Sequence, residues 1–507
     1  MRGAAQREVP CAAMPAFPAA ALVFVSSGAV LVLEILAVRL LAPYVGVTLE
    51  VYTAIIGVVL AGIAVGSWLG GRLADRIDPR GTIGPMLVFG GVLAFLTLPL
   101  VDGLGSGLRG ATPTTTTVLT FLAFFAPAAV LSGVTPSVIK LQLASLDQTG
   151  RVVGRLSAIS TAGAILGTFV TGFVLVAAWP TRPVIRVLAV SLVLLGIAVS
   201  VWLRRVRPLS AGSVVAALLA GTFSFAASHP CDYESAYFCA YVELDPERES
   251  GRALWLDTLR HSYVDLEDPS YLEFTYMQWF SDVLTATAPD GGPLDTLHVG
   301  GAGFTMPRYL REEHPGSRST VLELDELLVE LAKQELGLEL RDDIEVVTGD
   351  ARLGIQQTPT GAYDVVLGDA FGGVAVPWHL TTVEFLEQVH DRLRPDGLYV
   401  MNLVDYAERD FLRAQAATVA TVFDHVAVLA EEERFGPTRA DVGGNFVLVA
   451  GDRPLPLEEI QEANRARGRQ DTLLTGDELA AFVGDAPVLT DDHAPVDQLL
   501  TPLPLKG

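Results

Sequence analysis

Basic side chains are scarce in this sequence. Its 507 residues include 35 Lys and Arg against 58 Asp and Glu, which gives a formal net charge of −23 at pH 7. Binding to nucleic acid depends on a basic face that neutralises phosphates. The acidic balance therefore argues against nucleic acid as a partner.

Cysteine is also rare. Two of the three cysteines, Cys231 and Cys239, lie eight positions apart. No nearby pair of His or further Cys completes a four-ligand set, so the sequence predicts no metal site here. The pair fits a disulfide, which persists in oxidising compartments and rarely in the cytosol. Two unpaired thiols are the alternative, and the sequence leaves both open.

Charged residues make up 18% of the chain, below the roughly 25% of soluble domains, and they are unevenly distributed. Residues 1–227 contain 15 Lys and Arg and 7 Asp and Glu, a net of +8, whereas residues 228–507 contain 20 and 51, a net of −31. All eight histidines lie in the second part. The change near residue 228 indicates a change of solvent from lipid to water.

Long apolar runs repeat through the first part. A helix that crosses about 30 Å of hydrocarbon needs roughly 20 apolar residues. Runs of this kind lie at 17–41, 51–71, 83–104, 117–138, 157–179, 184–203 and 209–227. We therefore predict a transmembrane α-helical bundle of about seven helices over residues 1–227. Because further spans follow the first run, it is interpreted as a retained helix and not a cleaved signal.

The basic residues of the short loops fall mostly on one side of this bundle. They are Arg2, Arg7, Arg72, Arg76, Arg80, Lys140, Arg151, Arg155, Arg204, Arg205 and Arg207. Such loops stay in the cytoplasm, so the N-terminus of this multi-pass cell-membrane protein is predicted inside. Seven spans then place the C-terminal part outside the cytoplasm, and a miscount by one span reverses that. Within the first run, Arg39 is expected to extend its charge from the helix end to the membrane surface, and a functional role for Glu34 is the alternative.

The second part predicts an α/β fold. Segments 240–244 and 252–256 predict strands of a small antiparallel sheet within residues 228–265. Residues 266–507 predict a Rossmann-like domain of the methyltransferase type, with a first helix over 268–287. Its strands are expected at 294–299, 319–323, 344–347, 363–367, 398–402 and 445–450.

A glycine-rich turn directly follows the first of these strands. Gly300, Gly301 and Gly303 stand between the strand and a helix expected over 305–313. Glycines permit a tight turn and a close approach of the backbone to a ligand, and the N-terminus of the next helix favours negative groups. A plain turn is the alternative interpretation.

Acidic residues end the next three strands. Glu323 lies about 20 positions after the glycines, where a carboxylate accepts hydrogen bonds from ribose hydroxyls. Asp350 and Asp369 follow the third and fourth strands. Ligands bind outside the carboxyl ends of the strands in an open parallel sheet, so we expect the three acids to meet at one crevice.

These residues carry a resemblance to a known family. Residues 234–450 resemble the polyamine synthases, also called spermidine synthases or aminopropyltransferases, and the whole chain is similar to bacterial fusions of a major-facilitator-like membrane segment with such a domain. The motifs are Tyr271-Leu-Glu273, Val299-Gly-Gly-Ala-Gly303, Val321-Leu-Glu-Leu-Asp325, Gly349-Asp350, Asp364-Val-Val-Leu-Gly-Asp369, Leu393-Arg-Pro-Asp-Gly397, Glu34-Ile-Leu-Ala-Val-Arg-Leu-Leu-Ala-Pro43 and Gly70-Gly-Arg-Leu-Ala-Asp75.

The resemblance implies a reaction in which an amine attacks the carbon beside the sulfonium of decarboxylated S-adenosylmethionine. It assigns the proton acceptor to Asp369, the ribose contact to Glu323, and the adenine contact to Asp350 with Ala351. It implies neither a metal nor a covalent nucleophile, because holding the two reactants in line supplies much of the acceleration.

The same resemblance implies an acceptor site. Tyr271 and Glu273 fall where the family binds its polyamine, and His261 stands at the position of a family Gln. His379 is a further candidate for substrate contact, with a structural histidine as the alternative.

Two carboxylates of the family pattern are missing from the sequence. Gly303 replaces the Asp that binds the free amine of the donor, and Gly372 replaces an Asp that binds the polyamine. Their loss removes charge pairing that would offset the desolvation of a polycation. The departures argue against spermidine synthesis proper.

Three functions remain open on the sequence. The first is a membrane-anchored transferase that uses decarboxylated S-adenosylmethionine, or S-adenosylmethionine itself, to alkylate an amine. The second is methyl transfer from S-adenosylmethionine. The third is non-catalytic binding or transport of a polyamine or nucleoside. The hypothesis of transport by one chain is weakened, because major-facilitator carriers pair two six-helix halves and this chain has about one. A homodimer would supply two halves.

Overall fold

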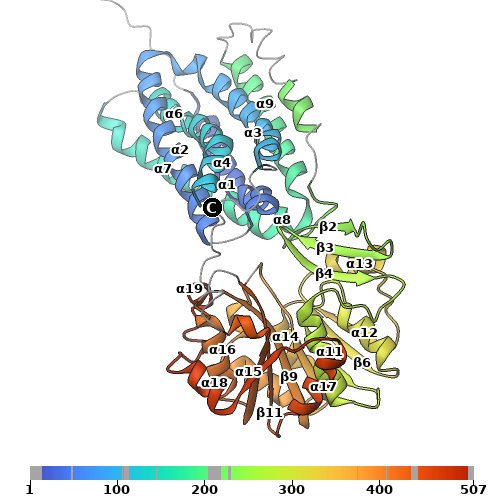
Figure 1. Ribbon diagram of the computed structural model, residues 1–507. Coiled ribbons are helices and arrows are strands. Elements are labelled where there is room, and N and C mark those ends of the chain that lie inside the picture. The colour runs from blue at the N-terminus through green and yellow to red at the C-terminus, as the bar shows by residue number, and fades with distance from the viewer. Residues whose placement is uncertain are drawn as a thin grey trace, which may run out of the picture. The chain divides into compact units, whose positions relative to one another are not determined.

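The computed structural model describes residues 14–46, 49–105, 107, 113–143, 146–203, 219–225, 230–373, 375–406, 408–435 and 443–500. The chain forms two compact units, Met1–Cys239 and Ala240–Gly507. Figure 1 shows helices in the first unit and a mixed α/β arrangement in the second.

Long apolar helices build the N-terminal unit. They are α1 (Ala16–Val45), α2 (Leu49–Arg76), α3 (Ile83–Gly105), α4 to α6 (Pro113–Thr120, Ala126–Ser132 and Val134–Gln142), α7 (Thr149–Val170), α8 (Val176–Ala178) and α9 (Thr181–Trp202). Two π-helical turns, η2 (Phe121–Phe125) and η4 (Thr171–Leu175), join α4 to α5 and α7 to α8. Within the described residues, six helical stretches are long and apolar enough to cross a membrane. They correspond to the first six predicted runs.

The seventh predicted span, at 209–227, lies mostly outside the described residues. Of this span, residues 219–225 are described, and they are helical. A count of seven helices therefore stays a prediction.

Glycines bring the apolar helices into close contact. A Cβ atom on Gly66 of α2 would lie 2.0 Å from the carbonyl oxygen of Ala129 in α5. A Cβ on Gly163 of α7 would lie 2.2 Å from the carbonyl oxygen of Phe24 in α1. Where the hydrophobic effect does not drive association, such close backbone approach supplies the van der Waals contact between helices.

A disulfide joins Cys231 to Cys239, with the Cα atoms 5.2 Å apart. The loop it closes contains β1 (Tyr233–Glu234). Arg39 of α1 forms an ion pair with Glu234 at 3.7 Å and donates hydrogen bonds to the carbonyl oxygens of Ser235 and Ala236. Arg39 therefore has partners within the protein, and its expected position at the membrane surface stays a prediction.

The C-terminal unit begins with a small antiparallel sheet formed by β2 (Cys239–Leu244), β3 (Gly251–Leu256) and β4 (Leu259–Asp265). The two predicted strands of this region match β2 and β3. The register between β3 and β4 shifts after Leu254. Leu254 pairs with Ser262, but the next residue, Trp255, pairs with Arg260. His261 is therefore the extra residue of a β-bulge, which redirects the side chains on either side of it.

An eight-stranded sheet forms the centre of this unit, in the order β12-β10-β11-β9-β8-β5-β6-β7. Its strands are β5 (Asp295–Val299), β6 (Arg318–Glu323), β7 (Ile344–Thr348), β8 (Tyr363–Gly368), β9 (Leu393–Asp405), β10 (His425–Ala430), β11 (Gly444–Gly451) and β12 (Thr472–Thr475). Strands β5 to β9 are parallel, and β11, β10 and β12 add in antiparallel pairs. The predicted strands match β5 to β9 and β11.

Helices cover this sheet. They are α11 (Thr275–Thr287), α12 (Thr305–Glu313), α13 (Glu326–Glu335), α14 (Ala351–Gly354), α15 (Val383–Arg392), α16 (Asp410–Val419), α17 (Leu457–Ala466), α18 (Gly476–Val483) and α19 (Val496–Leu499). The inner strands bury consecutive residues, as in Val365–Leu367 and Phe446–Ala450, which requires cover on both faces.

The strand order positions the candidate site. From β5 the chain adds β6 and β7 on one side, then crosses to add β8 and β9 on the other. The connections after β5 and β8 therefore diverge at the carboxyl ends of these two strands. In doubly wound sheets, ligands bind at this switch point.

Candidate active site

The glycine turn lies at the switch point. Gly300 has φ +100°, a conformation that side chains rarely adopt, and its amide donates to the carbonyl oxygen of Leu322 at 2.9 Å. A Cβ here would lie 2.5 Å from the carbonyl oxygen of Asp369. Glycine is therefore required both for the turn and for the close approach of the loop that carries Asp369.

Glu323 is bound directly to the glycine turn. One carboxylate oxygen accepts hydrogen bonds from the amides of Gly301 and Ala302, both at 2.9 Å, and the other accepts from the amide of Asp325 at 2.9 Å. The side chain is buried, and desolvation raises the pKa of its carboxyl group, although the three amide donors oppose that rise. Glu323 therefore joins the glycine turn to the end of β6, and its predicted contact with ribose stays a prediction.

The third glycine faces the small sheet. The amide of Gly303 donates to the hydroxyl of Ser262 at 3.0 Å, and a Cβ at this position would lie 2.6 Å from the Ser262 Cβ. In addition, the Thr305 hydroxyl donates to the carbonyl oxygen of Tyr263 at 3.1 Å. These contacts hold the start of α12 against β4.

Asp350 begins α14 and lies beside His379. One carboxylate oxygen accepts from the amide of Leu353 at 3.2 Å, and the other lies 3.0 Å from His379 Nε2. Ala351 is buried directly after it. His379 therefore lies on the side of the site predicted for adenine and contacts neither Tyr271 nor Glu273 in the hydrogen bonds of the described residues.

A C-terminal segment holds this side of the site. Asp491 binds Arg352 at 2.6 Å and accepts from the Thr382 hydroxyl at 2.7 Å. Arg352 in turn donates to the carbonyl oxygen of His379 at 2.7 Å. The segment thus fixes the backbone that carries the histidine opposite Asp350.

Asp369 is enclosed by polar partners that sequence reasoning missed. Asn402 of β9 donates to one carboxylate oxygen at 2.8 Å, and the Tyr276 hydroxyl of α11 donates to the other at 3.1 Å. Asn445 of β11 orients Asn402 by donating to its amide oxygen at 3.0 Å. Burial raises the pKa of Asp369 to about 6, while the donors from Asn402 and Tyr276 oppose that rise.

The polar residues Asn402 and Asn445 could have been found from the sequence, because Asn402 interrupts the apolar strand β9 and Asn445 directly precedes the apolar run of β11. Tyr276 gave no such signal, since an aromatic residue on an amphipathic helix is ordinary core. Its contact depends on the packing of α11 beside β8 and β9.

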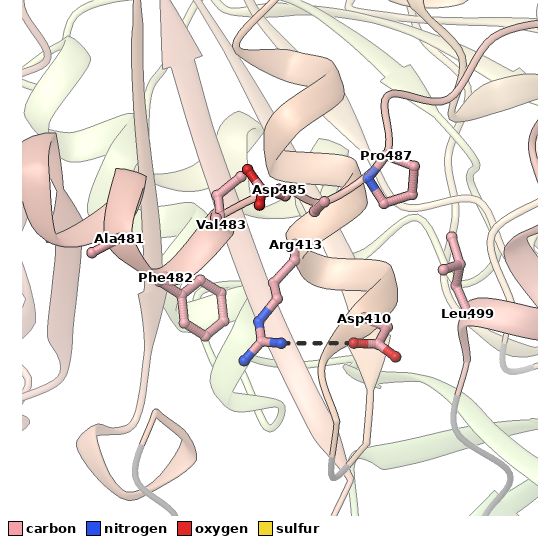
Figure 2. Close-up of a pocket in the computed structure, with 10 residues that line it drawn as sticks. Asp410, Arg413, Ala481, Phe482, Val483, Asp485, Pro487 and Leu499 are labelled. Atoms are coloured by element: carbon pink, nitrogen blue, oxygen red, sulfur yellow. Dashed lines mark ion pairs between the residues drawn. The ribbon is translucent and has the colours of Figure 1, made fainter.

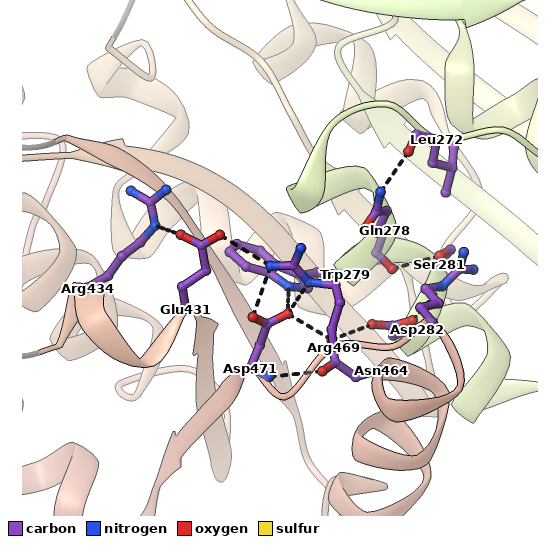
Figure 3. A network of polar contacts seen from close by, with 11 residues as sticks. Leu272, Gln278, Trp279, Ser281, Asp282, Glu431, Arg434, Asn464, Arg469 and Asp471 are labelled. Carbon is purple, nitrogen blue, oxygen red and sulfur yellow. Dashed lines mark hydrogen bonds and ion pairs between the residues drawn. The ribbon is translucent and has the colours of Figure 1, made fainter.

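A polar network holds α11 in place (Figure 3). The indole of Trp279 donates to Asp471 at 2.7 Å, and Asn464 donates to both Asp282 and Asp471 at 3.0 Å. Asp282 is fully buried, and desolvation raises the pKa of its carboxyl group. Because Trp279 lies one turn after Tyr276, the network also fixes the helix that presents the tyrosine hydroxyl to Asp369.

The predicted acceptor residues lie just before α11. The Tyr271 hydroxyl donates to one oxygen of Glu273 at 2.7 Å, and Arg260 binds the other at 3.3 Å. His261, the bulge residue, is partly buried, and desolvation lowers its pKa to about 4, so the imidazole is neutral near pH 7. Sequence reasoning missed Arg260.

Backbone hydrogen bonds bring the strand ends together. The Gly349 amide donates to the carbonyl oxygen of Glu323 at 2.8 Å, and the Asp369 amide donates to that of Val299 at 2.9 Å. Glu323, Asp350 and Asp369 therefore stand at the carboxyl ends of β6, β7 and β8, with β5 between β6 and β8. The three acids lie at the carboxyl edge of the sheet, as expected, and a shared crevice among them stays a prediction.

A separate cavity of about 530 Å³ lies among α16, α18 and α19 (Figure 2). Its lining includes Asp410 and Arg413, which form an ion pair at 3.7 Å, together with Phe482 and Leu499. None of the predicted site residues lines it. Among the described residues, no group of three or more His, Cys, Asp or Glu side chains could hold a metal ion.

Comparison with known proteins identifies relatives of part of the chain. Over 244 residues it is 27% identical to a probable polyamine aminopropyl transferase of Bifidobacterium longum, a match that covers 44% of this chain and 52% of the relative. Part of this chain is homologous to the polyamine aminopropyltransferases. The match spans about half the length of that relative, and no family model matches the chain.

Two further similarities accompany this one. The chain is 28% identical over 121 residues to an eEF1A lysine and N-terminal methyltransferase of Danio rerio, covering 22% of this chain and 18% of the relative. Among solved structures, a probable spermidine synthase from Corynebacterium glutamicum is 28% identical with a TM-score of 0.48, covering 52% of this chain and 96% of that chain.

Proposed function

We propose that this protein is a membrane-anchored transferase that alkylates an amine with an adenosyl sulfonium donor, decarboxylated S-adenosylmethionine or S-adenosylmethionine. The observation that carries the proposal is the enclosed carboxylate of Asp369, whose pKa of about 6 suits a general base near neutral pH. It stands beside the glycine turn, whose amides bind Glu323, the acid expected to contact the ribose.

The roles of the residues follow from their contacts. The amine nitrogen would form a bond to a carbon beside the sulfonium, the carbon–sulfur bond would break with its electron pair moving to sulfur, and Asp369 would accept the proton released by nitrogen. Tyr276 and Asn402 hold the carboxylate in one orientation. Gly301 and Glu323 would bind the ribose side of the donor, and Asp350 the adenine.

The homology to polyamine aminopropyltransferases supports transfer of an aminopropyl group. Methyl transfer is a second candidate, because relatives from Danio rerio and Homo sapiens are named methyltransferases. Both reactions need the same adenosyl site and differ in the group that lies beside Asp369.

Transfer assays with the purified full-length protein test the proposal. Incubation with each donor, labelled on the transferable group, and a set of primary amines should give an alkylated amine and the corresponding thioether. Label found as aminopropyl or as methyl on the product decides between the two reactions. Absence of product with every amine, together with no calorimetric binding of either donor, would show that the proposed function is wrong.

We further propose that the C-terminal unit lies outside the cytoplasm. Glu234 accepts from the backbone amide of Thr181 at 2.9 Å and pairs with Arg39, so residue 234 lies at the end of the bundle where α9 begins. Trp202 is at the other end of α9, roughly 30 Å away for a 22-residue helix. Trp202 and Glu234 therefore lie at opposite ends of the bundle, which supports an odd number of membrane crossings before the C-terminal unit. The disulfide between Cys231 and Cys239 supports an oxidising compartment.

Labelling of Cys231 and Cys239 in intact cells tests this placement. In a Cys11→Ser background, a membrane-impermeant reductant followed by an impermeant maleimide should label two thiols per chain without permeabilisation, because the loop faces the exterior. Omission of the reductant is the control and should give no label. If labelling requires permeabilised cells, the C-terminal unit is cytoplasmic.

A further inference from the structure

Arg260 is connected to the candidate reaction centre through aromatic rings. Its guanidinium lies 5.0 Å from the centre of the Phe274 ring, which stacks on the Tyr276 ring at 5.8 Å. The Tyr276 hydroxyl binds Asp369. An extended acceptor with its amine at Asp369 and its chain along these rings would therefore direct its far end toward Arg260.

At this far end, the acceptor oxygens are occupied, whereas some N–H donors of Arg260 are not. Both oxygens of Glu273 are used, one by the Tyr271 hydroxyl at 2.7 Å and the other by the two terminal nitrogens of Arg260 at 3.3 Å. A guanidinium has five N–H donors, and this one directs two of them at a single oxygen over a long distance. Arg260 is about one-third exposed, so it retains donors that a ligand can reach.

The ionisable groups near the reaction centre likewise offer little to a second cationic group. Asp369 accepts hydrogen bonds from Asn402 and Tyr276, Glu323 accepts from three backbone amides, and desolvation keeps the partly buried His261 uncharged near pH 7. A second ammonium group on the acceptor would meet the positive charge of Arg260 and a carboxylate whose oxygens are already bonded. Such an ammonium would lose its hydration without full replacement.

We propose that the acceptor is an amine that carries a carboxylate at its far end, and that Arg260 binds this carboxylate. The inference rests on the proposed function and names its substrate class. Planar guanidinium groups bind carboxylates through two parallel hydrogen bonds, which a compact ammonium does not reproduce. Arg260 therefore selects against simple diamines and for amino acids whose amine and carboxylate lie at opposite ends.

Putrescine and 4-aminobutanoate provide the test, because they share a four-carbon chain and differ in one end group, ammonium against carboxylate. With the full-length protein, kcat/KM for 4-aminobutanoate should exceed that for putrescine by about 10-fold or more, the scale of one hydrogen bond between charged groups. Arg260→Gln should lower kcat/KM for 4-aminobutanoate by about 10- to 100-fold without lowering that for putrescine. Arg260→Lys should recover only part of the preference.

The control is Arg341→Gln, which removes the same charge from an exposed surface pair with Glu339 and should leave the preference unchanged. A preference for putrescine in the unaltered protein, or an unchanged ratio in Arg260→Gln, would overturn the inference. If neither amine is alkylated, the full set of amines and donor calorimetry decide the proposed function, and calorimetric titration of 4-aminobutanoate decides the inference. Binding that is lost in Arg260→Gln supports it, whereas no binding to the unaltered protein overturns it.

Discussion

Asp369→Asn is expected to lower the kcat of amine alkylation by about 10²- to 10⁴-fold, the range of general base catalysis. Asparagine has nearly the same shape as aspartate, so Tyr276 and Asn402 can still surround it. It has no carboxylate to accept the proton of the amine. Initial rates with a labelled donor measure the effect.

Donor binding provides the control for this variant. Calorimetry should give a similar Kd for the donor in Asp369→Asn and in the unaltered protein, because the ribose and adenine contacts are elsewhere. Asp396→Asn is a matched surface variant, since Asp396 is exposed and pairs with Arg453, and it should keep full activity. A rate in Asp369→Asn within tenfold of the unaltered protein would show that Asp369 is not the base.

The same carboxylate sets a pH dependence. Burial favours the neutral acid and raises the pKa of Asp369 to about 6, so the fraction that can act as base falls as pH decreases through this value. The alkylation rate should therefore decrease as the pH falls below 6. At still lower pH, Asp369 is protonated and no longer contributes to the rate. The ratio of the unaltered protein's rate to that of Asp369→Asn, measured between pH 5 and 8, isolates this step from protonation of the amine.

Glu323→Ala is expected to lower the free energy of unfolding by about 3–9 kcal/mol and to abolish donor binding. Three backbone amides, those of Gly301, Ala302 and Asp325, bind this carboxylate, and each buried donor left without a partner costs about 1–3 kcal/mol. Without the carboxylate, the glycine turn loses its anchor to β6. Thermal unfolding of the full-length protein and donor calorimetry measure the two effects.

Glu323→Gln separates the loss of hydrogen bonds from the loss of side-chain volume. Glutamine keeps one acceptor oxygen and has a similar size, so it should lose less stability than Ala while still weakening the donor. If both variants unfold at the same temperature as the unaltered protein and bind the donor equally well, Glu323 does not join the turn to β6.

Much of the C-terminal fold could be predicted because its elements are locally marked. The helix expected at 305–313 matches α12, and the apolar segments that end in Glu323 and Gly349-Asp350 match β6 and β7 within one residue. Apolar runs bounded by glycines and acids mark buried parallel strands regardless of how they are ordered. Strands β10 and β12 were not predicted.

The bulge at His261 and the partner of Arg39 could not be predicted in the same way. A bulge changes which residues face each other across two strands, and its position depends on the pairing with β3. Arg39 meets a loop almost 200 residues later in the chain. Such contacts depend on packing that spacing along the chain does not record.

The sequence alone therefore determined the division into an apolar and an acidic part, the positions of strands β5 to β9 and β11 along the chain, and the three acids at the strand ends. These follow from hydrophobic patterning and turn residues, which act locally. The tertiary structure decided the partners of those acids: Tyr276 at Asp369, His379 at Asp350, and the glycine turn at Glu323. The reason is that a carboxylate's pKa and accessible ligands depend on which side chains lie within hydrogen-bond distance in the folded chain.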